Sequence, residues 1–213
     1  MRTHTEETQA TMTPEKALHY LQEGNERFVN NLKANRNLLQ QVNETKDGQF
    51  PFAVILSCID SRVSAELVFD QGLGDIFSVR IAGNFVNEDI LGSMEFACKI
   101  AGSKLIVVLG HSKCGAISGA IKNVEMGNLT GMLQKIKPAI ESVKQQGKPE
   151  DENFAQCVAE ENVHLAIANI KEKSSILNEM LDNGEIGIVG AMYNIETGVV
   201  FFQDIEIKEK AAV

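Results

Sequence analysis

The sequence contains no tryptophan and only four cysteines and four prolines among its 213 residues. Four cysteines are too few for a disulfide-stabilised scaffold in a chain of this length. No apolar run approaches the roughly 20 residues of a membrane-spanning helix, and the amino-terminal segment lacks the apolar stretch of a secretion signal. These absences predict a cytoplasmic protein whose cysteines stay reduced and are available to bind a metal or do chemistry.

Positive charge is also scarce, because 20 Lys and Arg against 29 Asp and Glu give a net charge of −9. A nucleic-acid or anionic-membrane surface needs clustered basic residues, so we expect neither partner. Apolar residues make up 44% of the chain and charged residues 23%, which is typical of globular domains. Length and composition together predict one compact domain.

Continuous apolar runs without alternation predict strands that are buried on both faces of a sheet. Helical segments lie between the runs. The pattern predicts an α/β fold, with a mostly parallel central sheet of about four strands plus a C-terminal edge strand, flanked by helices. The predicted strands are residues 52–57, 76–80, 105–109, 186–192 and 199–202, and the predicted helices are residues 65–69, 88–100, 114–124 and 151–181.

Residues 1–48 precede this pattern and are predicted to form an N-terminal helical arm, ahead of an α/β core at 49–205 and a tail at 206–213. Residues 1–12 are polar and are expected to be frayed. The segment Thr13-Pro14-Glu15 has the residue types that begin a helix. The apolar side of that helix is expected to include Leu18, Leu21, Phe28 and Leu32.

Two short segments carry metal-binding residues, and each directly follows a predicted buried strand. They are Cys58-Ile-Asp60-Ser-Arg62 and His111-Ser-Lys-Cys114. Ligand sites in parallel sheets form at the carboxyl ends of strands, so we expect both segments in one cleft. Two thiolates and one imidazole leave zinc a fourth, open position, which is the pattern of a catalytic site. Cys58, His111 and Cys114 are the predicted zinc ligands.

Other cysteine and glycine patterns favour structural roles. Cys98 and Cys157 lie inside predicted helices without a second ligand nearby, so they are predicted to pack as small apolar residues. The glycines at 110–115 lack the Lys and Ser/Thr of a phosphate-binding loop. Those at 72–74 lack the third glycine of a dinucleotide fingerprint. No nucleotide site is expected.

The motif at residues 58–62, followed by His-x-x-Cys-Gly at 111–115, resembles the β-carbonic anhydrases. The resemblance implies one Zn²⁺ per chain, assembly as a homodimer or homotetramer, and a lyase that hydrates CO2 reversibly to bicarbonate and a proton by a zinc-bound hydroxide. Similarity covers about residues 14–205, with supporting segments at 80–84, 106–110 and 190–193.

Within the resemblance, Cys58, His111 and Cys114 match the zinc ligands, while Asp60 and Arg62 match a catalytic dyad. Asp60 would orient the nucleophile, and Arg62 would hold the carboxylate. Alternatively, Asp60 becomes the fourth zinc ligand in a closed state. The sequence does not choose between the two states.

Three further residues are expected in the substrate cleft. Gln49 matches a glutamine that hydrogen-bonds substrate in the plant-like branch of the family. Phe77 and Phe96 are predicted to form an apolar pocket suited to CO2. The chain departs from the branch with an inhibitory bicarbonate site, because Ile55 stands where that branch has a tryptophan.

Three alternatives remain open from the sequence. A hydrolase of carbon disulfide or carbonyl sulfide could use the same zinc site. A non-catalytic zinc module is disfavoured, because structural sites close with four firm ligands. A cysteine nucleophile paired with His111 would leave Cys114 unexplained.

Overall fold

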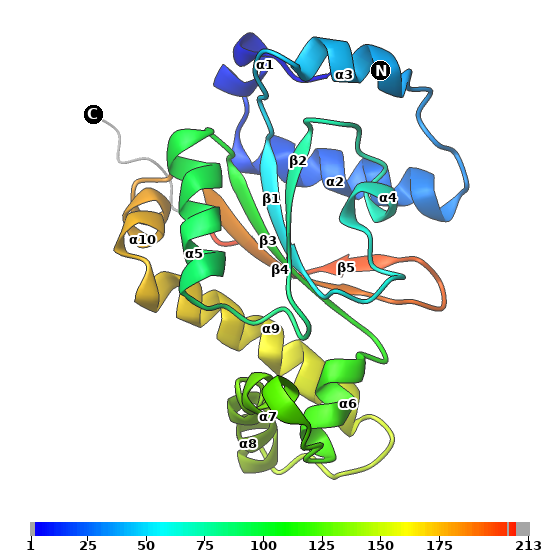
Figure 1. Ribbon diagram of the computed structural model, residues 1–213, viewed down its shortest axis with the longest axis vertical. Coiled ribbons are helices and arrows are strands. Elements are labelled where there is room, and N and C mark those ends of the chain that lie inside the picture. Colours follow the sequence, from blue (N-terminus) through cyan, green and yellow to red (C-terminus); the bar gives the residue numbers. More distant parts are fainter. Residues whose placement is uncertain (1–2, 204, 208–213) are drawn as a thin grey trace.

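The computed structural model describes residues 3–203 and 205–207. One five-stranded sheet forms its centre, in the order β2-β1-β3-β4-β5 (Figure 1). The first four strands are parallel, and β5 runs antiparallel to β4. This confirms the predicted α/β fold with its C-terminal edge strand. The strands are β1 (Ala53–Ser57), β2 (Ile76–Arg80), β3 (Leu105–His111), β4 (Gly187–Tyr193) and β5 (Val200–Phe202).

The inner strands explain the continuous apolar runs of the sequence. Every residue of β1, β3 and β4 is buried, because helices cover both faces of the sheet. In register, Ser57 of β1 lies beside Leu109 of β3 and beside Arg80 of β2. The segments that follow β1 and β3 therefore leave the sheet at the same edge.

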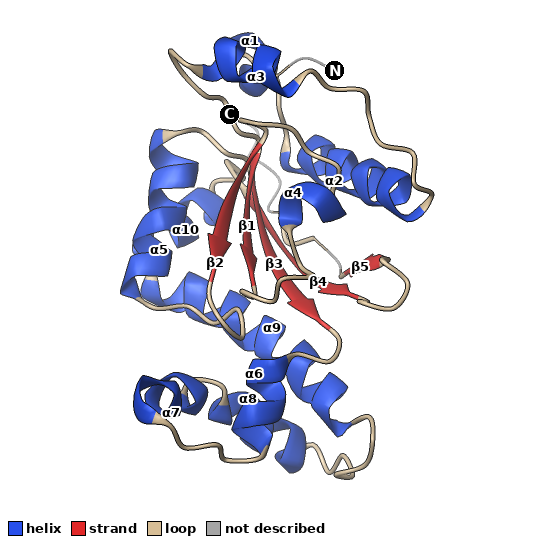
Figure 2. Cartoon of the chain, turned by 45° about the vertical axis from the view of Figure 1, so that its right-hand side comes forward, coloured by secondary structure: helices blue, strands red, loops and turns tan. Residues whose placement is uncertain are grey.

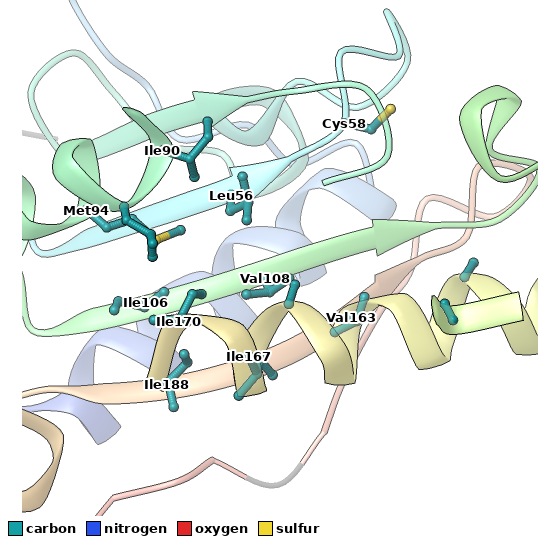
Figure 3. Close-up of a cluster of buried hydrophobic side chains, with 14 of the residues drawn as sticks. Leu56, Cys58, Ile90, Met94, Ile106, Val108, Val163, Ile167, Ile170 and Ile188 are labelled. Carbon is teal, nitrogen blue, oxygen red and sulfur yellow. The ribbon is translucent and has the colours of Figure 1, made fainter. Parts of the chain in front are cut away.

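The helices form a layer on each face of the sheet (Figure 2). On one face, Ala17 and Leu21 of the arm pack against β1 and β3. On the other face, Ile106 and Val108 of β3 pack against the long helix α9 (Figure 3). The first layer contains α2 (Pro14–Val29) and α4 (Ala65–Val68), and the second contains α5 (Glu88–Glu95), α9 (Phe154–Lys173) and α10 (Ser175–Asp182).

The arm begins with a helix where we expected frayed chain, so that prediction was wrong. Helix α1 (Glu6–Ala10) is stabilised by reciprocal hydrogen bonds between Thr5 and Thr8. Gln9 anchors it to the core, since its Nε2 donates to the carbonyl oxygens of Pro51 and Ala101, each at 2.8 Å.

The predicted helix start at residue 13 is confirmed, because Thr13 Oγ1 accepts a hydrogen bond from the Lys16 N–H. Helix α2 ends at Val29, however. Leu32, which we expected on its apolar side, lies beyond the helix and is 65% exposed. A further helix of the arm, α3 (Leu38–Thr45), follows.

The second half of the chain contains more helical breaks than expected. The stretch 151–181 is two helices, because Ser174 ends α9 and caps α10 by accepting from the Leu177 N–H. The stretch 88–100 changes after α5 into a π-helical turn, η1 (Phe96–Ile100).

Three helices, two of them not predicted, pack together beyond the carboxyl edge of the sheet (Figure 1). The unpredicted pair is stabilised by buried apolar side chains, including Leu133 and Val143. The three are α6 (Gly115–Ile121), α7 (Gly127–Gln134) and α8 (Lys137–Gln145).

Residues 208–213 of the predicted tail lie outside the described residues, and the division into arm, core and tail stays a prediction. No helix in the described part of the chain is long and apolar enough to cross a membrane.

Candidate metal centre

Three side chains that can bind a metal converge at the carboxyl edge of the sheet. Cys58 directly follows β1, His111 is the last residue of β3, and Cys114 is the N-cap of α6. The two sulfur atoms and a ring nitrogen of His111 all lie within 4.8 Å of one another, and all three residues are buried. The structure thus brings together the ligand set that the sequence predicts.

The distance between the two sulfur atoms fits a shared metal ion. Cys58 Sγ and Cys114 Sγ are 3.9 Å apart. A disulfide would require about 2.05 Å. Two sulfurs each bound at about 2.3 Å to a tetrahedral zinc ion would lie about 3.8 Å apart. The thiols are therefore separate and spaced as ligands of one ion.

The orientation of His111 leaves its Nε2 available to bind a metal. Its Nδ1 lies 2.9 Å from the carbonyl oxygen of Ser112, to which the protonated nitrogen donates. The Nε2 is buried and has no hydrogen-bond partner in the described part of the chain. A buried polar atom without a partner costs about 1–3 kcal/mol. A metal ion would engage this lone pair, and the donor set of two sulfurs and one nitrogen fits zinc.

The two thiols interact, and their pKa values are shifted in opposite directions. The pKa of Cys58 is lowered to about 4, chiefly because the Cys114 thiol donates a hydrogen bond to it; burial opposes this shift and the Gly83 N–H adds to it. The pKa of Cys114 is raised, because it is the donor to the Cys58 thiolate and is buried. A bound dication would supply the charge needed to deprotonate both.

Asp60 and Arg62 form a two-point ion pair beside the three ligands. Arg62 Nε lies 2.9 Å from Asp60 Oδ1, and Nη2 lies 2.7 Å from Oδ2. The backbone N–H of Arg62 also donates to Oδ1. These hydrogen bonds hold the pKa of the Asp60 carboxyl well below its usual range. The carboxylate is ionised, and its orientation is fixed by the planar guanidinium.

Arg80 is a site residue to which the sequence analysis gave no role of its own. From the end of β2, its Nε donates to the carbonyl oxygen of Cys58 at 2.9 Å, and its Nη2 donates to that of Asp60 at 2.7 Å. It therefore holds the backbone between the first ligand and the acid. The available signal was a cation at the carboxyl end of the predicted strand 76–80, where ligand sites of parallel sheets form.

The other three predicted cleft residues do not join this cluster within one chain. Gln49 precedes β1, whereas Cys58 follows it, and β1 alone spans about 17 Å. Phe77 and Phe96 contact each other edge to face, with ring centroids 6.2 Å apart. Their rings line a hollow of about 790 Å³ along the edge strand β2. Roles of Gln49, Phe77 and Phe96 in substrate binding therefore stay predictions.

Together these features define an α/β protein with a buried three-residue cluster that could hold a metal and an acid–arginine pair that follows the first of these residues. The carbonic anhydrase family model matches residues 53–200. Carbonic anhydrase 2 of Mycobacterium tuberculosis strain H37Rv is 37% identical over 199 residues, which cover 90% of this chain and 93% of that protein. A carbonic anhydrase of Mycolicibacterium smegmatis is 33% identical, with 88% and 92% covered.

Solved structures show the same likeness. The β-carbonic anhydrase CafA of Aspergillus fumigatus is 25% identical, with a TM-score of 0.69 over 89% of this chain and 90% of that one. A tetrameric β-carbonic anhydrase of Sordaria macrospora shares the fold at 20% identity, with a TM-score of 0.69 over 88% and 96%. The chain belongs to the β class of the carbonic anhydrase family and is an enzyme of that family.

Proposed function

We propose that the chain hydrates CO2 reversibly to bicarbonate and a proton, with a zinc ion held by Cys58, His111 and Cys114. The observation that carries this proposal is the buried set of three donor atoms, with His111 Nε2 unpaired, beside an ionised carboxylate. Three protein ligands leave one position open, as in catalytic zinc sites. Zinc, when bound, would lower the pKa of water and supply hydroxide as a nucleophile near neutral pH.

The ionised Asp60 carboxylate can only accept hydrogen bonds. Next to the ligand set, it would accept one from the attacking water or hydroxide and direct the oxygen lone pair at the carbon of CO2. An isolated carboxylate there would oppose hydroxide formation by like-charge repulsion. Arg62 offsets that charge and fixes the carboxylate through two hydrogen bonds.

The paired geometry of Asp60 is assigned to the active state. Both carboxylate oxygens are engaged by Arg62, so binding of Asp60 to the metal would require these hydrogen bonds to break or rearrange. Such a movement would fill the open position and stop turnover, which makes the closed state an inhibited one.

We further propose that the chain acts as a homodimer or homotetramer. Gln49 and Cys58 lie at opposite ends of β1, so Gln49 could reach substrate only in the cleft of another copy. Phe96 and Ile100, on η1 beside the edge strand, expose 52% and 73% of their surface, and a second copy would cover such apolar area. The Sordaria macrospora relatives with this fold are tetrameric.

The proposed reaction is tested by loading the purified chain with zinc, counting the metal by mass spectrometry, and following CO2 hydration by stopped flow. We expect about one zinc per chain, activity that disappears with a chelator, and recovery when zinc is restored. Sulfide release from carbon disulfide and carbonyl sulfide serves as the comparison reaction. A fully zinc-loaded protein without CO2 hydration above the buffer rate would refute the proposal. The cytoplasmic location stays a prediction.

A further inference from the structure

A buried asparagine of α9 contacts the loop that borders the first ligand. Asn162 is 4% exposed, and its Nδ2 donates to the carbonyl oxygen of Gly83 at 2.8 Å. An amide in such a place is unfavourable unless it is hydrogen-bonded. The hydrogen bond to Gly83 satisfies the buried amide nitrogen. The surrounding buried residues of the helix are apolar: Val158, Ala159, Val163 and Ala166.

Gly83 connects Asn162 to the metal site. Its backbone N–H donates to Cys58 Sγ at 3.4 Å. Its φ is +82°, and a Cβ at this position would lie 2.7 Å from Cδ1 of Ile136, so no other residue fits without displacement. The carbonyl oxygen of Gly83 is thus held by Asn162 while its N–H points at the thiol of Cys58.

We propose that Asn162 is a positioning residue of the metal centre, which acts through Gly83 by keeping its N–H directed at the Cys58 sulfur. This inference rests on the proposed function, because Cys58 must be a metal ligand. An N–H donor withdraws electron density from a thiolate. The metal then receives less charge from its two sulfur ligands and remains a better Lewis acid.

The test compares Asn162→Leu with Asn169→Leu in cobalt-substituted and zinc-loaded protein. Asn169 lies about two turns further along α9 and lines the same small cavity of about 200 Å³. Its Nδ2 donates within the helix, to the Leu165 carbonyl oxygen. The control substitution is therefore matched in residue type and helix, at a half-buried position whose amide bonds Leu165 and not Gly83.

In Asn162→Leu, we expect the sulfur-to-cobalt charge-transfer band to move to lower energy and zinc affinity to fall about 10-fold. In Asn169→Leu, both should keep their wild-type values. If Asn162→Leu also keeps the wild-type band and affinity and loses only thermal stability, Asn162 is merely structural and the inference is overturned.

A measurement on the wild type keeps the inference testable should Asn162→Leu not fold. In protein loaded with ¹¹³Cd, a scalar coupling between the Gly83 amide proton and the metal would support the N–H···S contact, and its absence would overturn it. A wild type that shows the coupling but does not hydrate CO2 would refute the proposed function alone. Absence of sulfur-to-cobalt charge-transfer bands in the cobalt-loaded wild type would refute both the proposed function and this inference.

Discussion

The sulfur atoms of Cys58 and Cys114 lie 3.9 Å apart at the carboxyl edge of the sheet, although they follow different strands. Cys58 comes after β1 and Cys114 comes after β3, and these two strands pair directly in parallel. Pairing of these strands therefore brings together the first and last of the three proposed ligands. The consequences of this arrangement can be measured one side chain at a time.

Replacement of Cys58 by serine should remove the metal. A serine hydroxyl is not deprotonated by zinc as readily as a thiol, so we expect zinc content to fall from about one per chain toward zero, with loss of CO2 hydration. The matched control is Cys98→Ser, since Cys98 is also buried but burial raises the pKa of its thiol to about 12. The zinc content of both variants is measured after dialysis. Full zinc content in Cys58→Ser would contradict the assignment of Cys58 as a ligand.

Asp60→Asn should keep the metal and lose turnover. The amide keeps the shape of the carboxylate but cannot act as an ionised acceptor, so we expect kcat to fall by about 10²–10⁴-fold at unchanged zinc content. Asp151→Asn, at an exposed position, is the control and should turn over as the wild type does. Unimpaired kcat in Asp60→Asn would remove Asp60 from the mechanism.

The ion pairs of Asp70 should make stability depend on pH. Arg27 Nε and Arg36 Nη1 each lie 2.6 Å from an Asp70 oxygen. Burial alone would raise the pKa of Asp70, but hydrogen bonds from Arg27, the Ala34 N–H and Arg36 outweigh it and the net pKa is lowered. The stabilisation is therefore complete above the unfolded-state pKa of about 3.9 and is lost as pH falls through the lower folded-state value.

Asp70→Asn should accordingly lower the free energy of unfolding by about 3 kcal/mol at pH 7, because two guanidinium groups lose the carboxylate that they face. Urea denaturation at pH 7 and pH 3 measures this, with Asp151→Asn as the control. The difference between wild type and Asp70→Asn should shrink at pH 3. A difference that grows in acid would show that the pKa of Asp70 is not lowered by folding.

Leu39→Lys should weaken assembly of the chain. Leu39 is 77% exposed on α3, next to the exposed Leu38, and a second copy that packs on this helix would bury their apolar surface. We expect the mass measured by light scattering to fall toward that of one chain. Activity should fall with it, if Gln49 serves the cleft of another copy.

The control for assembly is Gln40→Lys on the same helix. It places the same charge one residue away, where Glu44 can pair with it, since Gln40 Nε2 already bonds Glu44 Oε1 at 2.8 Å. Equal masses for the two variants, or a wild type that is monomeric at every concentration, would argue against an interface on α3.

The sequence by itself determined the fold class, and it predicted the cluster of Cys58, His111 and Cys114 that the structure brings together. Strands buried on both faces must be apolar throughout, so β1 and β3 are visible as uninterrupted runs. The proposed ligands could be predicted because Cys58 directly follows β1 and His111 is the last residue of β3. Parallel strands end at a common edge of the sheet, so residues at their carboxyl ends are expected to lie close together. The pairing of Asp60 with Arg62 is also local, two residues apart, and the structure contains it.

Local helical structure was less predictable. Helix α7 contains two glycines, which disfavour a helix in isolation, so packing of buried side chains such as Leu133 stabilises it. Helix α1 is polar and short, and its anchor is the contact of Gln9 with two distant carbonyl groups. Neither the packing that stabilises α7 nor the long-range contacts that anchor α1 can be predicted from a window of a few residues.

Only the tertiary structure decided what surrounds the ligands. The contact of Asn162 with Gly83 joins residues 79 positions apart and depends on how α9 packs across the sheet. The separation of Gln49 from Cys58 depends on the direction of β1. Sequence patterns record which strands are buried and where they end, because a strand buried on both faces is an uninterrupted apolar run. Contacts between helices, strands and loops are determined by tertiary packing, so a local sequence pattern does not predict them.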